Sequence, residues 1–181
     1  FCNRSVFKCS MNQTVETVFP DIAIPSPTYS VAQAPDKDIY IGTESNGLYI
    51  YSENWKLKKH VPIDGIIATI LPDNNGDIWL GLDETGICLF NKNKQTFTWL
   101  HKDNTNLNNN SIRTFVSYGD SSILVGTFRG LNILNKKELT ITPANISIAG
   151  KGGLSHYSIH SMLIDKDQTL WIGTYSAGVN Y

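Results

Sequence analysis

The chain lacks several features that would assign it to a common functional class. Charged residues make up 17% of its 181 residues and the formal net charge is −1, so the strongly basic surface of a nucleic-acid-binding protein is missing. No apolar run approaches the roughly 18 residues of a membrane-spanning helix, and no signal-peptide pattern opens the sequence. No long stretch has helical periodicity. These absences predict an all-β segment that contacts neither nucleic acid nor membrane.

Patterns of catalytic and metal-binding residues are missing as well. The three cysteines lack Cys-x-x-Cys spacing, the four histidines lack metal-ligand spacing, and no pattern pairs them with a Ser or Cys nucleophile. Asp73–Asp77 places its glycine too early for a calcium loop and predicts a hairpin turn instead. Gly150–Gly153 lacks the spacing of a phosphate-binding loop. We therefore predict no catalytic residue, no metal site and no cofactor in this segment.

The sequence does contain a repeat. Ile78–Phe90 has the pattern of a short apolar strand, a turn bounded by glycine and a second apolar strand. The pattern occurs four times, and the first glycines of the copies are Gly42, Gly81, Gly126 and Gly173. Successive copies are therefore 39, 45 and 47 residues apart. A repeat of this length indicates a propeller or a solenoid.

Each copy is predicted to contain four short strands. An innermost strand precedes the glycine-marked pair, at Val31–Ala34, Ile66–Leu71, Ile112–Val116 and Ile159–Ile164. A weak outer strand follows the pair, at Trp55–Lys58, Thr96–Leu100 and Leu139–Thr142. Four strands in a unit of about 40 to 50 residues are typical of a β-propeller blade.

We predict a single propeller domain of about four blades, each a four-stranded antiparallel sheet. Residues 1–19 are assigned to the outer strands of a preceding blade, and the blades that follow are 28–60, 66–100, 111–142 and the incomplete 158–181. Propellers close with about four to eight blades. To close a propeller ring, the chain therefore needs further blades from additional sequence. Alternatively, the N-terminal strands must complete the incomplete blade at 158–181. We expect the chain to be a segment of a longer propeller protein.

The repeated pattern is Ile-x-x-apolar-x-x-Asp, then apolar-Trp-Ile/Leu-Gly-Thr/Leu, then Gly-apolar, and it resembles the two-component regulator propeller repeat. The best matches are Ile159–Asp165 with Leu170–Thr174, and Ile67–Asp73 with Ile78–Gly81. The other two copies depart from the pattern, with Tyr40 and Leu124 in place of Trp. The resemblance covers about residues 28–181.

In that family the repeats build the periplasmic sensor region of hybrid two-component regulators. Two seven-bladed propellers are joined there to a small β-sandwich, a membrane helix and a cytoplasmic histidine kinase, and the ligands are typically oligosaccharides. The resemblance implies a non-enzymatic, ligand-recognising part of a seven-bladed propeller that relays a signal to a kinase outside this chain. The implied partners are an oligosaccharide or another small ligand and the neighbouring propeller and sandwich domains. A homodimer is left open.

The innermost strands carry one column of mixed chemistry. Aligned on their turns, the strands place Val31, Ala68, Arg113 and His160 together, between columns that are apolar. We predict that the mixed column lines the central channel, where Arg113 and His160 bind a polar or anionic ligand. The alternative is a hydrated channel without a ligand. The aromatic and glycine columns of the second strands are predicted to pack between blades.

The loops between second and third strands hold the other candidate ligand-binding residues, because functional residues of a scaffold concentrate in its loops. These candidates are Glu44, Asp83, Glu84, Arg129 and Tyr175. Two alternatives remain. A carbohydrate lyase or glycosidase would need paired carboxylates or a converging catalytic set, which the adjacent Asp83 and Glu84 do not supply. A protein-interaction scaffold would need no small ligand.

Overall fold

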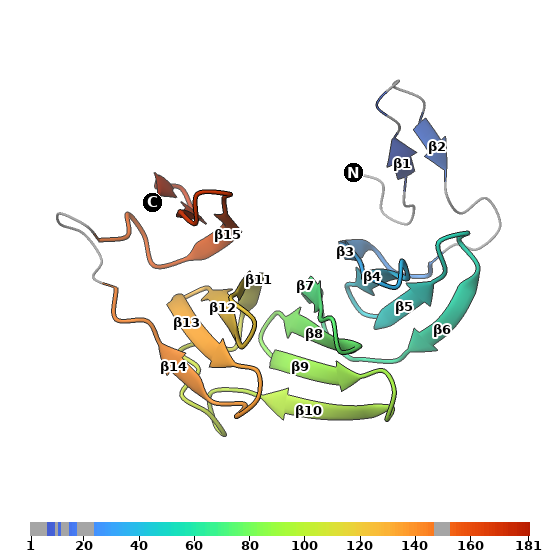
Figure 1. Cartoon of the computed structure of the whole chain (residues 1–181), viewed down its shortest axis with the longest axis horizontal. Helices are drawn as coiled ribbons and strands as arrows, with labels where there is room; N and C mark the ends of the chain where they lie inside the picture. The colour runs from blue at the N-terminus through green and yellow to red at the C-terminus, as the bar shows by residue number, and fades with distance from the viewer. Residues whose placement is uncertain (1–6, 10, 12–14, 18–23, 147–152) are drawn as a thin grey trace.

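The computed structural model describes residues 7–9, 11, 15–17, 24–146 and 153–181, and every regular element in these ranges is a β-strand. No helix among them is long and apolar enough to cross a membrane. Four antiparallel sheets follow one another as an arc, with the innermost strands on its concave side (Figure 1). The predicted all-β propeller segment is confirmed.

Each sheet is a blade in which strands adjacent in sequence are adjacent in space. Blade 1 consists of β3 (Thr28–Gln33), β4 (Ile39–Thr43), β5 (Leu48–Tyr51) and β6 (Leu57–Val61). Blade 2 consists of β7 (Ile67–Pro72), β8 (Asp77–Leu82), β9 (Gly86–Asn91) and β10 (Thr96–Leu100). Blade 3 consists of β11 (Ile112–Tyr118), β12 (Ser122–Thr127), β13 (Gly130–Asn135) and β14 (Ile141–Pro143). Blade 4 consists of β15 (Ile159–Ile164), β16 (Leu170–Thr174) and β17 (Gly178–Asn180).

The N-terminal strands form a sheet of their own. β1 (Phe7–Cys9) pairs with β2 (Val15–Thr17) in an antiparallel hairpin at one end of the arc (Figure 1). Blade 4 lies at the other end, so the arc is open in this structure. The assignment of residues 1–19 to a preceding blade, the blade boundaries and the seven-bladed closure all stay predictions.

The second strand of each inner blade is apolar on both faces because a neighbouring blade covers each face. In β8, Ile78 and Leu80 are buried in one core cluster with Tyr40 of blade 1. Trp79, between them in sequence, is buried in another cluster with Phe115 of blade 3. Successive side chains of a strand point to opposite faces. This explains why β8 is a continuous apolar run and does not alternate with polar residues.

The glycine column allows two neighbouring blades to come close together. A Cβ atom added to Gly81 would lie 2.5 Å from Cγ2 of Ile112 in the next blade and 2.6 Å from Cγ2 of Thr69. Gly126 meets Ile159 and Thr114 in the same way, at 2.7 Å from each Cγ2 atom. The glycines are thus required by the blade interfaces.

The aromatic column fills the wedge between blades 1 and 2 and between blades 2 and 3. Tyr40 and Trp79 have exposed fractions of 0% and 1%. Trp171, the matching residue of blade 4, is 38% exposed. The two indoles donate hydrogen bonds to the aspartate that opens the preceding turn, from Trp79 to Asp73 over 3.5 Å and from Trp171 to Asp165 over 2.7 Å.

Lysines also connect neighbouring blades. Lys92, which follows β9 of blade 2, lies 2.7 Å from carboxylate oxygens of Asp36 and of Asp38 in blade 1. Lys136, which follows β13 of blade 3, lies 3.0 Å from Asp73 in blade 2. Hydrogen bonding to Lys92 holds the pKa of Asp36 below its usual value. Burial alone would lower the pKa of Lys92, but its hydrogen bonds to the two aspartates outweigh burial and raise it.

Two outer strands begin later than predicted. β6 begins at Leu57 and β14 at Ile141, whereas strands from Trp55 and from Leu139 were expected. Trp55 and Leu139 have φ angles of 59° and 54°, in the left-handed region. A residue in that conformation ends a turn and cannot continue a strand.

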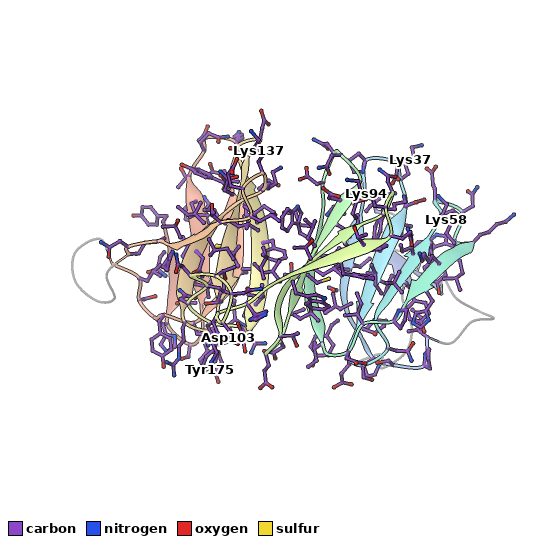
Figure 2. The ribbon with its side chains drawn as sticks, turned by 90° about the horizontal axis from the view of Figure 1, so that it is seen from below. Lys37, Lys58, Lys94, Asp103, Lys137 and Tyr175 are labelled. Carbon is purple, nitrogen blue, oxygen red and sulfur yellow. The ribbon has the colours of Figure 1, made fainter. Side chains whose placement is uncertain are left out.

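The arc has two unlike faces, which Figure 2 shows from the side. Lys37, Lys94 and Lys137 lie in tight turns at one edge, which we call the turn face. Tyr175 and Asp103 lie at the opposite edge, among the loops between second and third strands and the loops between blades. We call this edge the loop face.

Candidate functional site

One residue of each innermost strand is left out of the pairing with the second strand. The pairing register skips Tyr29, Ala68, Arg113 and His160. Each is therefore a β-bulge, a feature that changes the direction of a side chain and is common beside functional sites. All four stand near the start of their strands, the end that pairs with the residues just before the loop between second and third strands. The innermost strands lie on the concave side of the arc (Figure 1).

The prediction placed Val31 in this column, and that placement was wrong because Tyr29 occupies the position. Alignment on the turns assumes that the turn after β3 is shorter than the turn of blade 2. Instead, a hydrogen bond from the Ala34 amide to the Asp38 carbonyl, 2.9 Å long, closes a turn as long as that of blade 2. The 39-residue spacing of the first two glycines also separates Tyr29 from Ala68. That spacing is the sequence signal that gives the correct alignment.

Arg113 forms the charged centre of the candidate site. Its Nη1 atom lies 3.4 Å from Oδ2 of Asp83, in the β8–β9 loop of the neighbouring blade. Its Cζ atom lies 6.0 Å from the ring centre of Phe128, in the β12–β13 loop. The Arg113 side chain is 30% exposed, and its buried Nε has no hydrogen-bond partner among the residues that the structure describes. The guanidinium is thus held from two sides and still has unused donor capacity.

Five rings continue from Arg113 across blades 3 and 4. Phe128 meets Tyr157 edge to face at 6.4 Å, and His156 stacks on Tyr157 at 4.3 Å. Tyr175 lies 6.2 Å from His156 and 5.4 Å from His160. We call Phe128, His156, Tyr157, His160 and Tyr175 the ring cluster. Phe128 lies in the β12–β13 loop and Tyr175 in the β16–β17 loop. His156 and Tyr157 precede β15, and His160 is the bulged residue of β15.

The ring cluster presents aromatic surface to solvent. The exposed fractions of Phe128, Tyr157 and Tyr175 are 41%, 40% and 58%. His156 accepts a hydrogen bond from the Ser158 amide at Nδ1, over 3.0 Å. The proton of its neutral ring therefore lies on Nε2. Exposed aromatics that contact one another are already ordered, so a ligand that binds them immobilises few further side chains.

The structure brings together four of the seven predicted ligand-binding residues. Arg113 and Asp83 form the ion pair, and His160 and Tyr175 belong to the ring cluster. Glu84, Arg129 and Glu44 do not join them. Among the described residues, no side-chain hydrogen bond or ion pair links any of these three to the site. Whether any of the seven binds a ligand stays a prediction.

The arrangement supplies recognition groups but no obvious reaction centre. Its single carboxylate, Asp83, faces an arginine, and no group of three or more His, Cys, Asp or Glu residues in the described ranges is arranged to hold a metal ion. Aromatic faces can stack on the apolar face of a ligand ring, and an arginine–carboxylate pair offers both donors and acceptors. Such a site suits a polar, ring-containing ligand.

Solved structures of similar fold include two extracellular domains from B. thetaiotaomicron. One, BT3049, named as a hybrid two component system, is 24% identical over 97% of this chain, with a TM-score of 0.68. The other, BT4673, also named so, is 19% identical over 97% of this chain, with a TM-score of 0.76. This chain spans only 26% and 24% of those two solved chains.

A third solved structure is an enzyme, a catalytically inactive variant of virginiamycin B lyase from Staphylococcus aureus with quinupristin. It is 12% identical over 97% of this chain and 58% of its own length, with a TM-score of 0.65. Identities this low establish the fold alone. No curated protein sequence matches the chain.

The family comparison identifies one copy of the repeat. Residues 153–176 match the family described as "Two component regulator propeller". The matched range contains β15 and β16 and four of the five residues of the ring cluster. The chain is a β-propeller segment that carries the two component regulator propeller repeat.

Proposed function

We propose that this chain is the ligand-recognition portion of an extracytoplasmic two-component sensor and that its ligand is an oligosaccharide. The observation that carries the proposal is the ring cluster beside the Arg113–Asp83 pair, at the loop-face end of the channel. The repeat at residues 153–176 and the names of the two B. thetaiotaomicron domains support the sensor role.

The chemistry of the cluster fits a sugar. A pyranose ring has an apolar face that stacks on aromatic side chains and an edge of hydroxyl groups that need hydrogen-bond partners. Tyr175 and Tyr157 supply exposed faces, while Arg113 and Asp83 supply a donor and an acceptor. A sugar bound here contacts blades 3 and 4 through the rings and blade 2 through Asp83.

The proposed mechanism is a shift between states of the whole receptor. A ligand that contacts three blades favours the receptor state in which those contacts are complete, and the equilibrium moves by the difference in affinity between the states. The propeller then passes a changed orientation to neighbouring propeller and sandwich domains. In this proposal the segment is periplasmic and the kinase that receives the signal lies elsewhere in the protein.

An enzyme and a protein scaffold are the competing functions. Hydrolysis of a glycosidic bond needs two carboxyl groups on either side of the bond, and the contact network around Arg113 contains one, Asp83. The lyase of similar fold is the observation that favours an enzyme. Turnover of an oligosaccharide by the purified chain would therefore reject the non-catalytic role.

The proposal is tested by measuring the melting temperature of the chain against a panel of neutral and acidic oligosaccharides. A ligand that binds the native state raises the melting temperature in proportion to its concentration on a logarithmic scale. For the best ligand, calorimetry on Tyr175→Ala should show affinity reduced about tenfold, since an aromatic stacking contact contributes about 1 kcal/mol or more.

Tyr118→Ala is the matched control. Tyr118 is 55% exposed, almost the same as Tyr175, but it ends β11 at the turn face. The control should bind like the unaltered chain. A flat melting temperature across the panel, or equal losses in both variants, would reject oligosaccharide binding at this site and favour the scaffold.

A further inference from the structure

A second concave surface on the loop face lies at the outer rim of the arc, away from the ring cluster. It is a groove of about 340 Å³ between the connector that follows β6 and the outermost strand of blade 2. Its lining residues are Pro62, Ile63, Asp64, Thr85, Phe97 and Trp99. β10 lies on the outside of the arc (Figure 1), and its first three residues are exposed.

Two aromatic side chains of β10 form one wall of the groove. Phe97 and Trp99 are two residues apart on a strand and therefore point to the same face. Phe97 is 42% exposed and stacks on Phe90 of the adjacent strand at 5.0 Å, with an angle of 21° between the rings. Trp99 is half-buried against the core cluster shared by blades 1 and 2. Both rings are fixed by packing before any ligand arrives.

Polar groups with unused hydrogen-bonding capacity stand opposite the rings. Asp64 is exposed, and no ion pair or hydrogen bond in the described part of the chain engages its carboxylate. Within the described ranges, the Thr85 hydroxyl donates one hydrogen bond, a long one of 3.5 Å, to the carbonyl of Asp83. The groove therefore combines stacking surface with an exposed carboxylate and a hydroxyl that is only weakly engaged.

We propose that this groove is a second carbohydrate subsite and that it takes a neutral pyranose. Its volume falls within the range of small-molecule pockets, about 300 to 1,000 Å³. Its one charged residue is Asp64, which repels carboxylated or sulfated sugars and accepts hydrogen bonds from sugar hydroxyls. A single carboxylate is too few for a metal site.

This inference rests on the proposed function and deepens it. The loop between β8 and β9 serves both places, since Asp83 faces Arg113 at the ring cluster while Thr85, two residues later, lines the groove. An oligosaccharide receptor with two subsites on one face holds two residues of a long chain, or two chain ends, and gains affinity by linking them.

The test uses the indole N–H signals of the four tryptophans in nuclear magnetic resonance spectra. The unaltered chain is titrated with cellohexaose, xylohexaose, mannohexaose and maltohexaose, and with a hexamer of galacturonic acid. At least one neutral hexaose should move the Trp99 signal, and the uronate should move it less. Asp64→Ala should weaken that neutral response about tenfold, because a hydrogen bond to a charged group is lost.

The control variant is Asp103→Ala, an exposed aspartate of the loop face that lies outside the groove. It should leave the Trp99 response unchanged, and both variants should melt like the unaltered chain. A Trp99 signal unmoved by every hexaose, while Tyr175-dependent binding persists, rejects the subsite but leaves the proposed function standing. If no oligosaccharide binds at the groove or at the ring cluster, both the subsite and the proposed function are rejected. A Trp99 signal that moves only with the uronate, or only with a lysine-rich peptide, also rejects the neutral sugar.

Discussion

Blades 2 and 4 contain the same motif in different surroundings. Each has an indole that donates to the aspartate opening its own turn, at Trp79 and at Trp171. Trp79 is 1% exposed and Trp171 is 38% exposed. Beside Gly81 lies Ile112 of the next blade, whereas the described neighbours of Gly173 all belong to Ser161 of its own blade. The motif therefore specifies a complete hairpin by itself. For the interface between blades it supplies one surface, and the next blade must supply the other.

The difference separates local from interblade stabilisation. Turns, register and the indole–aspartate bond arise within one repeat, so blade 4 has them without a further neighbour. The blade that follows covers the aromatic ring, and its side chains leave no room for a Cβ atom at the glycine. The exposed face of blade 4, with Leu163 at 62% and Val179 at 66%, has the composition of an interface.

The largest expected effect comes from removing the two indoles. Trp79→Ala should lower the free energy of unfolding by about 3 to 5 kcal/mol, because a large buried side chain leaves a cavity. Trp171→Ala should cost less than half as much, because its ring is partly in water and its hydrogen bond is local. Urea unfolding followed by circular dichroism measures both values. Equal losses would show that the two blades are buried alike in solution.

The next largest effect concerns the glycines. Gly126→Ala should destabilise the chain by about 1 to 3 kcal/mol, because the new methyl group overlaps Ile159 and Thr114. Gly173→Ala should change stability by about 0.5 kcal/mol or less, since its close neighbour is the Ser161 hydroxyl, which can rotate away. The same unfolding experiment applies. A larger loss at Gly173 than at Gly126 would contradict the interface explanation of the glycine column.

The smallest effect is on the acid titration of two aspartates. The pKa of Asp36 is lowered first by its hydrogen bond from Lys92 of the next blade, and that of Asp165 first by its bond from Trp171 of its own blade. A carboxyl with a lowered folded pKa stabilises the fold above its ordinary pKa, 3.8 here, and this stability is lost as pH falls through the lower folded value. Lys92→Met should therefore raise the pKa of Asp36 and leave that of Asp165 unchanged.

Carboxyl carbon shifts followed by nuclear magnetic resonance between pH 2 and pH 6, about the ordinary range of carboxyl titration, measure both groups. Lys92→Met should also cost about 1 kcal/mol or less at neutral pH, because Lys58 still pairs with Asp38. Movement of both pKa values together would mean that the two turns are coupled through the arc.

Local features of the fold were predictable from the sequence. The Gly42–Gly81 spacing and the Asp73–Asp77 turn fix strand number and hairpin order, because turn chemistry and apolar pattern act over a few residues. The start of β6 was missed because no local rule places Trp55 in the left-handed region.

The candidate site was predictable only in part. Arg113 and His160 stand out as polar residues in an otherwise apolar strand, and both lie in the site. Their partners depend on contacts between blades: Asp83 is 30 residues from Arg113 in sequence, and Phe128 is 29 residues from Tyr157. The groove of Phe97 and Trp99 was missed because those residues were regarded only as part of an outer strand. Periodicity identifies elements, but it does not show which side chains meet when elements from different repeats are brought together.

The bulge of the innermost strands has a consequence for how this propeller segment can change over evolution. The four bulged residues are Tyr, Ala, Arg and His, whereas the positions that follow them, opposite the glycines, hold Ser or Thr in every blade. The bulged side chain takes no place in the ladder, so its identity is free of the constraints that fix its neighbours. Mutation there can alter the chemistry of the concave surface while the architecture persists. In each blade of this chain a bulged residue of varied chemistry thus precedes a small hydroxyl residue, Ser or Thr, that pairs with the glycine.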